Sequence, residues 1–147
     1  MTAHCFTYGS LMCEDIMSAV CGTACNRHEP ATLIGHRRHP VIGQHYPGMV
    51  PAAGSTVAGV LYLDLPASAW PRLDAFEGEE YTREAVTVAL SDSRSLTAWT
   101  YVFKPQYAGR LATGDWDFEH FLRYGKTGFE AAYLGFSAVQ GNPDSIV

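Results

Sequence analysis

The segment Thr56–Leu65 is the feature that most constrains how this chain folds. It reads TVAGVLYLDL and is apolar at nearly every position. Such a run predicts a strand at the centre of a sheet. The apolar segments 31–34 and 40–43 are shorter and are interrupted by glycine and proline, and PAAGS at 51–55 predicts a turn before the central strand. These interruptions predict bent or bulged strands, so we expect a curled sheet rather than a flat one.

Helices and a hairpin complete the predicted architecture. The β-rich runs Arg83–Leu90 and Leu96–Phe103 are joined by the polar sequence SDSRS and predict a hairpin. Helices are expected over Leu11–Val20, where apolar residues recur at helical spacing, and over Pro66–Phe76, where Pro71 should delay or distort the first turn. Together these elements predict an α+β fold, a small mixed or antiparallel β-barrel with flanking helices.

The C-terminal part of the chain is expected to be less regular. From Asp115 onward the spacing of aromatic residues predicts a short amphipathic helix, which Gly125 and Gly128 should interrupt. The length of 147 residues is typical of one domain. We expect that domain to span residues 1–136 and residues 137–147 to form a loose polar tail.

Composition narrows the class of partner. The net charge is −5, from 15 acidic residues against 10 Lys and Arg. This balance argues against a nucleic-acid partner, because phosphate binding depends on clustered cations. The adjacent basic pair Arg37-Arg38 is therefore expected to be a solvated turn or strand edge.

The expected location is the cytoplasm, without a membrane partner. No apolar run approaches the length that crosses a bilayer, and Met1–His4 lacks the basic start of a signal peptide. The four cysteines all lie within the first 25 residues and form no CxxC pair. In that compartment they are expected to be reduced thiols, because a domain of this size does not need disulfides.

The first candidate for a functional element is the sequence Tyr8-Gly9-Ser10-Leu11. A strand is predicted to enter it and a helix to leave it, with Ser10 as the helix N-cap and Gly22 as its terminator. The backbone N–H groups at such a helix start form a site for an anion, and glycine lets the ligand come close. A plain strand-to-helix turn is the alternative. The lysine of a phosphate-binding loop is missing, so nucleotide binding is not indicated.

The second candidate is Glu77, at the predicted end of a helix. The helix dipole disfavours a negative charge there, and Asp74, Glu79 and Glu80 add like charge. Phe76, with the aromatic residues Trp70 and Tyr81, is expected to exclude water from it. All three influences raise the pKa of a carboxyl group toward the range useful for proton transfer near neutrality. The alternative interpretation is a solvated acidic turn.

A wider set of segments carries a resemblance to a known family. In chain order they are FTYGSL at 6–11, ATLIG at 31–35, YP at 46–47, VAGVLYL at 57–63, LDAFEG at 73–78, YTR at 81–83, AWTYV at 98–102 and GDWDF at 114–118. With these motifs in this order, the chain resembles the gamma-glutamylcyclotransferase-like family, including its plant avirulence-induced-gene-type branch. The resemblance extends over about residues 4–136.

The resemblance implies a reaction and a site. The implied reaction is the intramolecular aminolysis of a γ-glutamyl amide, which releases 5-oxoproline and a free amine without metal or other cofactor. Glu77 is the implied proton-transfer residue, and the implied pocket lies between it and the loop at 8–11. The residues implied to bind the glutamyl group are those of the loop and one strand residue, namely Tyr8, Gly9, Ser10, Leu11 and Tyr101.

Other kinds of site are less well supported. His36, His39 and His45 lie close in sequence but match no metal-binding pattern. Ser10 lacks the GxSxG context of a nucleophile. Cys13 is expected to pack rather than to react. A non-catalytic module that binds small anions on the same fold is the alternative function, and the leaving group, the oligomeric state and the role of segment 104–115, a lid or a mobile loop, stay open.

Overall fold

The computed structural model describes residues 2–131 of the chain. It divides into two compact units, with the boundary between Trp116 and Asp117. The first unit contains all the strands described below, and the second contains the last helices. The tail predicted for residues 137–147 lies outside the described residues, as does the predicted domain end at 136.

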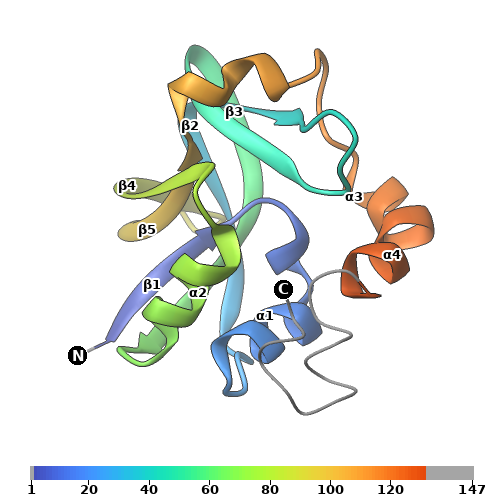
Figure 1. Ribbon diagram of the computed structural model, residues 1–147. Coiled ribbons are helices and arrows are strands. Elements are labelled where there is room, and N and C mark those ends of the chain that lie inside the picture. Colours follow the sequence, from blue (N-terminus) through green and yellow to red (C-terminus); the bar gives the residue numbers. More distant parts are fainter. Residues whose placement is uncertain (1, 132–147) are drawn as a thin grey trace. The chain divides into compact units, whose positions relative to one another are not determined.

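Five strands form a closed barrel in the first unit (Figure 1). Around the barrel the strand order is β1-β3-β2-β4-β5, and all neighbours are antiparallel except β1 and β5, which are parallel. This confirms the predicted small mixed barrel with flanking helices. The strands are β1 (Thr2–Thr7), β2 (His28–Pro40), β3 (Pro47–Pro66), β4 (Tyr81–Leu90) and β5 (Ser95–Phe103).

The predicted central strand is confirmed, but it is longer than expected. β3 pairs with β1 on one side and β2 on the other, and the turn predicted at 51–55 is wrong because these residues lie inside it. In the ladder, Pro51 pairs with His36 and Thr56 pairs with Ile34, so β3 carries extra residues opposite β2. Such a bulge bends both strands and increases their twist, which lets long strands close a small barrel.

Side chains help to close the barrel at the β1–β5 seam. The ladder there contains one register pair, Cys5 with Trp99. The hydroxyl of Thr100 donates to the carbonyl of Phe6 at 2.9 Å, and Thr100 is fully buried. A buried hydroxyl with a partner stabilises this seam where backbone bonds are few.

The barrel interior is packed with apolar side chains. Ala98 and Val102 of β5 point into it, and Thr100 lies between them on the same face, as strand alternation requires. The interior cluster consists of Phe6, Tyr8, Ala31, Leu33, Met49, Val57, Leu61, Val88, Leu90, Ala98 and Val102. Tyr101 and Phe103 therefore belong to the outer face of the same strand.

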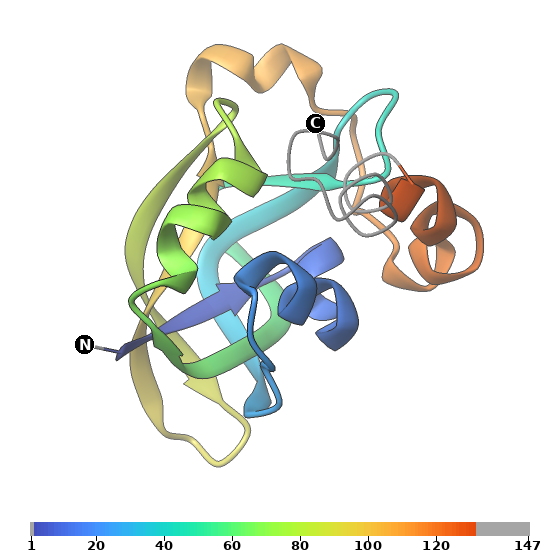
Figure 2. The same cartoon turned by 60° about the horizontal axis from the view of Figure 1, so that its bottom comes forward.

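Two helices lie side by side outside the barrel, as Figures 1 and 2 show. They are α1 (Glu14–Cys21) and α2 (Ala69–Glu77). The guanidinium of Arg72 donates from Nε to the carbonyl of Val20 at 2.7 Å, which satisfies a carbonyl at the end of α1. Gly22 ends α1 with φ 75°, as predicted.

The predicted starts of both helices are wrong. A 3-10 turn, η1 (Ser10–Met12), precedes α1, whose N-cap position is Cys13, so Ser10 does not cap α1. At the other helix, Pro66 ends β3 and α2 begins at Ala69. Pro71 falls in the first turn of α2, where its missing N–H costs nothing, and the helix starts three residues after Pro66, in agreement with the delay predicted from Pro71.

The second unit is helical from Phe118 to Glu130 in α3 (Phe118–His120), η3 (Phe121–Gly125) and α4 (Lys126–Glu130). The predicted interruption at Gly125 and Gly128 is wrong. A glycine inside a helix costs about 1 kcal/mol. Burial of Phe121 and Phe129, whose rings meet edge to face at 5.7 Å, offsets that cost.

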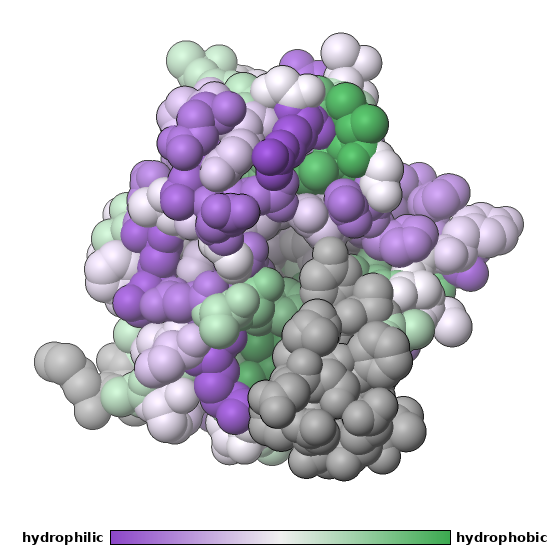
Figure 3. All heavy atoms as spheres, viewed as in Figure 1, coloured by the Kyte–Doolittle hydropathy of each residue, from purple (hydrophilic) through white to green (hydrophobic). Residues whose placement is uncertain are grey.

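On the side of the molecule shown in Figure 3, the surface of the described residues is largely hydrophilic, with hydrophobic residues in separate patches. In the described range 2–131, the helices are too short or too polar to cross a membrane. The segment after β5 forms a 3-10 helix, η2 (Pro105–Arg110), and the bridge between Val41 and Leu111 joins the chain beyond it to the end of β2.

Candidate active site

Glu77 is the last residue of α2, and Gly78 fixes that end. Gly78 has φ 79° and ψ −164°, a conformation that essentially only glycine adopts. Its N–H donates to the carbonyl of Asp74 at 3.1 Å. The predicted helix end is therefore confirmed, and the glycine after Glu77 turns the chain sharply into β4.

Glu77 is half-buried as a residue. Loss of hydration, followed by the negative charge of Asp74, raises its pKa to about 8. Glu80, which we expected to contribute, is held by other groups. It accepts hydrogen bonds from Tyr46 at 2.9 Å and from Arg110 at 2.8 Å. The alternative interpretation of Glu77 as part of a solvated acidic turn is therefore wrong.

Asp74 lies one helical turn before Glu77 and has two partners from the barrel. Its Oδ1 accepts a hydrogen bond from the Tyr101 hydroxyl at 2.7 Å and lies 3.3 Å from Arg83 Nε. Arg83 and Tyr101 are cross-strand neighbours on β4 and β5, so their side chains share one face. The Arg83 guanidinium also lies 5.0 Å from the Trp70 ring and 5.1 Å from the Trp99 ring, measured to the centroids.

Tyr8 joins the loop to this group. Its hydroxyl donates to the carbonyl of Tyr101 at 2.7 Å. Burial raises the pKa of Tyr8, and the charge of Glu77 raises it further, so the two groups are close. Burial and then the hydrogen bond to Asp74 raise the pKa of Tyr101. We call this set the Glu77 cluster: Tyr8, Asp74, Glu77, Arg83 and Tyr101.

The loop after Tyr8 presents backbone donors. Within residues 2–131, the N–H groups of Gly9, Ser10 and Leu11 have no hydrogen-bond acceptor. The Leu11 side chain is buried, so its contribution to a ligand is limited to its backbone. A Cβ on Gly9 would come within 2.8 Å of Pro47 Cδ, so only glycine fits here.

Arg38 fixes the orientation of this loop. Its Nη1 donates to the carbonyl of Tyr8 at 2.8 Å, while Nε and Nη2 bind both carboxylate oxygens of Asp115 at 2.8 and 3.2 Å. In a trans peptide the carbonyl and the next N–H point in opposite directions, so the Gly9 N–H faces away from Arg38. The ring of Trp116 lies 5.5 Å from the guanidinium.

The expectation that Arg37-Arg38 is solvated is wrong for Arg38, whose side chain is only 13% exposed. The charge balance gave no reason to single out one arginine. Its partners Tyr8 and Asp115 are distant in sequence, and no local pattern links them to β2. Arg83 was missed for the same reason, because its stacking partners come from α2 and β5.

A second group of buried titratable side chains lies around α1. All four cysteines are buried thiols, as predicted. Burial and the neighbouring Cys25 thiol raise the pKa of Cys21 to about 12. Burial also raises the pKa of Tyr62, with the cysteines adding to the effect. We call this set the cysteine cluster: Cys5, Cys13, Cys21, Cys25 and Tyr62.

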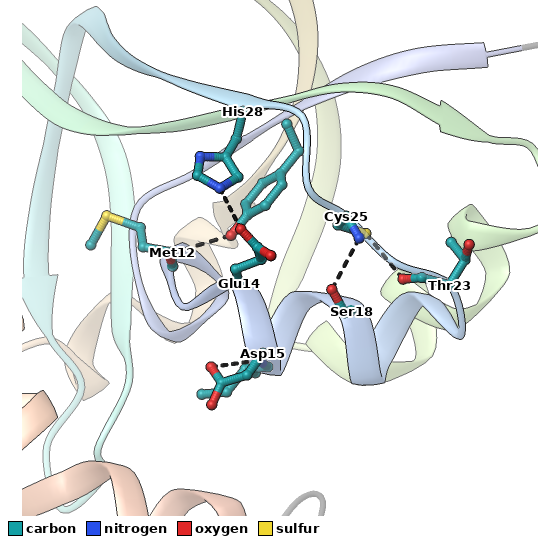
Figure 4. A network of polar contacts seen from close by, with 9 residues as sticks. Met12, Glu14, Asp15, Ser18, Thr23, Cys25 and His28 are labelled. Atoms are coloured by element: carbon teal, nitrogen blue, oxygen red, sulfur yellow. Dashed lines mark hydrogen bonds and ion pairs between the residues drawn. The ribbon is translucent and has the colours of Figure 1, made fainter.

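The connection that carries Cys25 is held by polar contacts, shown in Figure 4. The backbone N–H of Cys25 donates to the Ser18 hydroxyl at 3.0 Å. His28 Nε2 and Glu14 Oε1 are 2.7 Å apart. These bonds tie the loop after α1 to that helix. In the part of the chain that the structure describes, no three His, Cys, Asp or Glu side chains are grouped to hold a metal ion.

The chain is similar in sequence and fold to known proteins. The family described as "Gamma-glutamyl cyclotransferase, AIG2-like" matches residues 5–118. AIG2-like protein D of Arabidopsis thaliana is 34% identical over 126 residues, which are 84% of this chain and 82% of that protein. A solution structure from Arabidopsis thaliana has a TM-score of 0.69 and 26% identity, over 97% of this chain and 95% of the other. A structure named gamma-glutamyl cyclotransferase has a TM-score of 0.62, over 71% and 68%; at 19% identity it shows the shared fold alone.

Proposed function

Because the chain belongs to the gamma-glutamyl cyclotransferase, AIG2-like family, we propose that it converts γ-glutamyl amides into 5-oxoproline and a free amine. One observation carries this proposal. The carboxyl group of Glu77, with its pKa raised to about 8, acts on the buried Tyr8 side chain at the start of a loop whose three backbone N–H groups have no acceptor within residues 2–131. The family resemblance expected from the sequence is confirmed by the match to residues 5–118.

The loop supplies the binding half of the site. The α-carboxylate of the substrate accepts hydrogen bonds from the N–H groups of Gly9, Ser10 and Leu11. Arg38 keeps the loop in the orientation that exposes the first of these donors. Holding the carboxylate there brings the α-amine and the γ-carbonyl of one molecule together, which supplies the proximity that a two-molecule reaction lacks.

Glu77 supplies the proton transfer. α-Amino groups in peptides titrate at about 7.7–8.0, so an ordinary glutamate of pKa about 4.3 would accept that proton uphill by about 5 kcal/mol. With the pKa of Glu77 at about 8, the transfer is close to balanced. The free amine then attacks the γ-carbonyl carbon, the new C–N bond closes the five-membered ring, and the old amide C–N bond breaks.

The proton taken from the amine returns to the leaving nitrogen. Glu77 holds it during ring closure and donates it as the amide bond breaks. The ring nitrogen loses its second hydrogen as the ring forms, and Glu77 relays this proton to the released amine, which leaves as an ammonium ion. Glu77 is regenerated as a carboxylate. Tyr101 is proposed to contribute by facing the site from β5, and its hydroxyl is already engaged by Asp74.

A substrate panel tests the proposal. The purified protein is incubated with γ-glutamyl amino acids, γ-glutamyl amines including γ-glutamyl-lysine, and glutathione, and 5-oxoproline is measured. We expect turnover of at least one class and none with Glu77→Gln. If no member of the panel reacts while 5-oxoproline or glutamate raises the melting temperature, the protein is the non-catalytic anion-binding module instead.

A further inference from the structure

Asp74 has more partners than a partly exposed helix residue requires. Its side chain is 45% exposed, yet one of its oxygens receives both the Tyr101 hydroxyl and the Arg83 guanidinium. We propose that Asp74 is a positioning residue, whose fixed negative charge, one helical turn before Glu77, makes Glu77 a stronger proton acceptor for the substrate amine. This inference rests on the proposed cyclotransferase function and extends it to residues that do not touch the substrate.

The helix places the two carboxylates on one face. Residues three apart on a helix have Cβ atoms about 5–6 Å apart. Two like charges at that distance oppose each other, so the group that ionises last binds its proton more tightly. Between Asp74 and Glu77 the asymmetry is set by partners, because Asp74 has Tyr101 and Arg83. Asp74 thus has a hydroxyl donor and a cation in contact with it, the partners that a carboxylate binds.

Arg83 is held where it can balance Asp74. Its guanidinium carbon lies 5.0 Å from the ring centroid of Trp70 on α2 and 5.1 Å from that of Trp99 on β5. These cation–π contacts hold the guanidinium beside Asp74, whose Oδ1 lies 3.3 Å from Arg83 Nε. A cation so confined partly balances Asp74 and limits how far the negative charge acts on Glu77.

The other titratable groups near Glu77 are neutral around pH 8. They come from β1 and the loop after it, from β4 and from β5, and burial raises the pKa of each: Cys5, Tyr8, Tyr81 and Tyr101. Glu80, on the same connection as Tyr81, is neutralised by Arg110. Asp74 is the charged group whose effect raises the pKa of Glu77, and Arg83 is the cation in contact with Asp74.

A direct titration tests this inference without any need for turnover. Protein labelled with ¹³C at glutamate carboxyl groups is titrated by NMR, and the Glu77 signal is identified by its loss in Glu77→Gln. In Asp74→Asn, which keeps the shape and an acceptor for Tyr101, the pKa of Glu77 should fall by about one pH unit. In the matched control Glu79→Gln, which removes an exposed carboxylate two residues from Glu77, it should not move.

Arg83→Gln should change the pKa of Glu77 in the direction opposite to Asp74→Asn. Without the guanidinium the charge of Asp74 is unbalanced, so the pKa of Glu77 should rise. In the double variant Asp74→Asn with Arg83→Gln this rise should vanish, because the arginine acts through the aspartate. If Asp74→Asn does not fold, the single Arg83→Gln titration still decides, since a fall or no change overturns the inference.

If Asp74 had a purely structural role, Tyr101→Phe and Asp74→Asn should change the pKa of Glu77 alike. Tyr101→Phe removes the hydrogen bond and keeps the charge, so on our inference the pKa of Glu77 stays high in this variant. Equal falls in Tyr101→Phe and Asp74→Asn would overturn the inference and leave the proposed function intact. On an active substrate, Asp74→Asn should lower kcat about tenfold and move the acidic limb of the pH profile down with the pKa.

Discussion

The Glu77 cluster and the cysteine cluster each contain titratable groups that have lost hydration, but this shared physical cause has opposite consequences in them. Loss of hydration is the largest influence on Glu77 and on Cys21. It raises the pKa of the carboxyl group to about 8 and that of the thiol to about 12. The carboxyl group is thereby moved into the physiological range, while the thiol is moved out of it.

The comparison teaches that burial, which raises the pKa of carboxyl groups and thiols alike, favours proton transfer at neutral pH only in a group whose ordinary pKa lies below neutrality. Cys5 marks the border between the two clusters. Burial raises the pKa of its thiol, and the nearest further influences are Glu77 from one cluster and Cys21 from the other. We therefore assign chemistry to the Glu77 cluster and packing to the cysteine cluster.

The largest expected effect is that of removing the Glu77 carboxylate. Glu77→Gln keeps the size and cannot take the proton, so kcat/KM should fall about 10³-fold or more. Glu79→Gln is the control and should stay within about twofold of wild type. If Glu77→Gln kept activity within a few-fold of wild type, the assignment of catalysis to the Glu77 cluster would be wrong.

The pH profile should show the raised pKa directly. Glu77 is protonated below a pKa of about 8, and only its carboxylate can act as the base. kcat/KM should therefore fall about tenfold for each pH unit below about 8, rather than stay flat down to pH 5 as for an ordinary glutamate. Because the substrate amine titrates in a similar range, the NMR titration of Glu77 separates the two contributions. A flat profile would contradict the assignment.

Gly9→Ala tests whether the site extends from the cluster to the loop. The added methyl group would meet Pro47 at 2.8 Å, so the loop must shift by a few tenths of an ångström. We expect kcat/KM to fall about 10- to 100-fold, since small displacements of bound groups are costly. Gly109→Ala, where no atom lies within 4 Å of the added carbon, should have no effect. Equal activity in both variants would remove the loop from the site.

The smallest effect is expected in the cysteine cluster. Cys21→Ala should leave kcat/KM within about twofold and lower the free energy of unfolding by about 1–2 kcal/mol through lost packing. In the wild type, a thiol with a pKa of about 12 should react with a thiol reagent far more slowly than glutathione does. Rapid labelling of Cys21, with loss of activity, would show that this cluster is chemically active.

Much of the fold could be predicted because its signals are local. The apolar run in β3, the hairpin of β4 and β5 and the helix end at Glu77 each depend on neighbouring residues. The turn at 51–55 was misplaced because a bulge and a turn use the same residue types, and only pairing with β2 distinguishes them.

Only part of the candidate site could be predicted from the sequence. Glu77 and the loop stand out by motif, and Asp74 by its spacing from Glu77. Arg38 and Arg83 could not be found in this way, because a side chain becomes buried and paired only when distant segments meet. Their partners were visible in the sequence, but their pairing was not.

The β1–β5 seam has a consequence for how the molecule moves. A single register pair and the Thr100 hydroxyl close it, so amide hydrogens along this edge should exchange with deuterated solvent sooner than those between β2 and β3. Tyr8 and Tyr101 are joined across that edge. Local opening of this edge would move Tyr8 and weaken product binding at the loop, while the rest of the barrel stays folded.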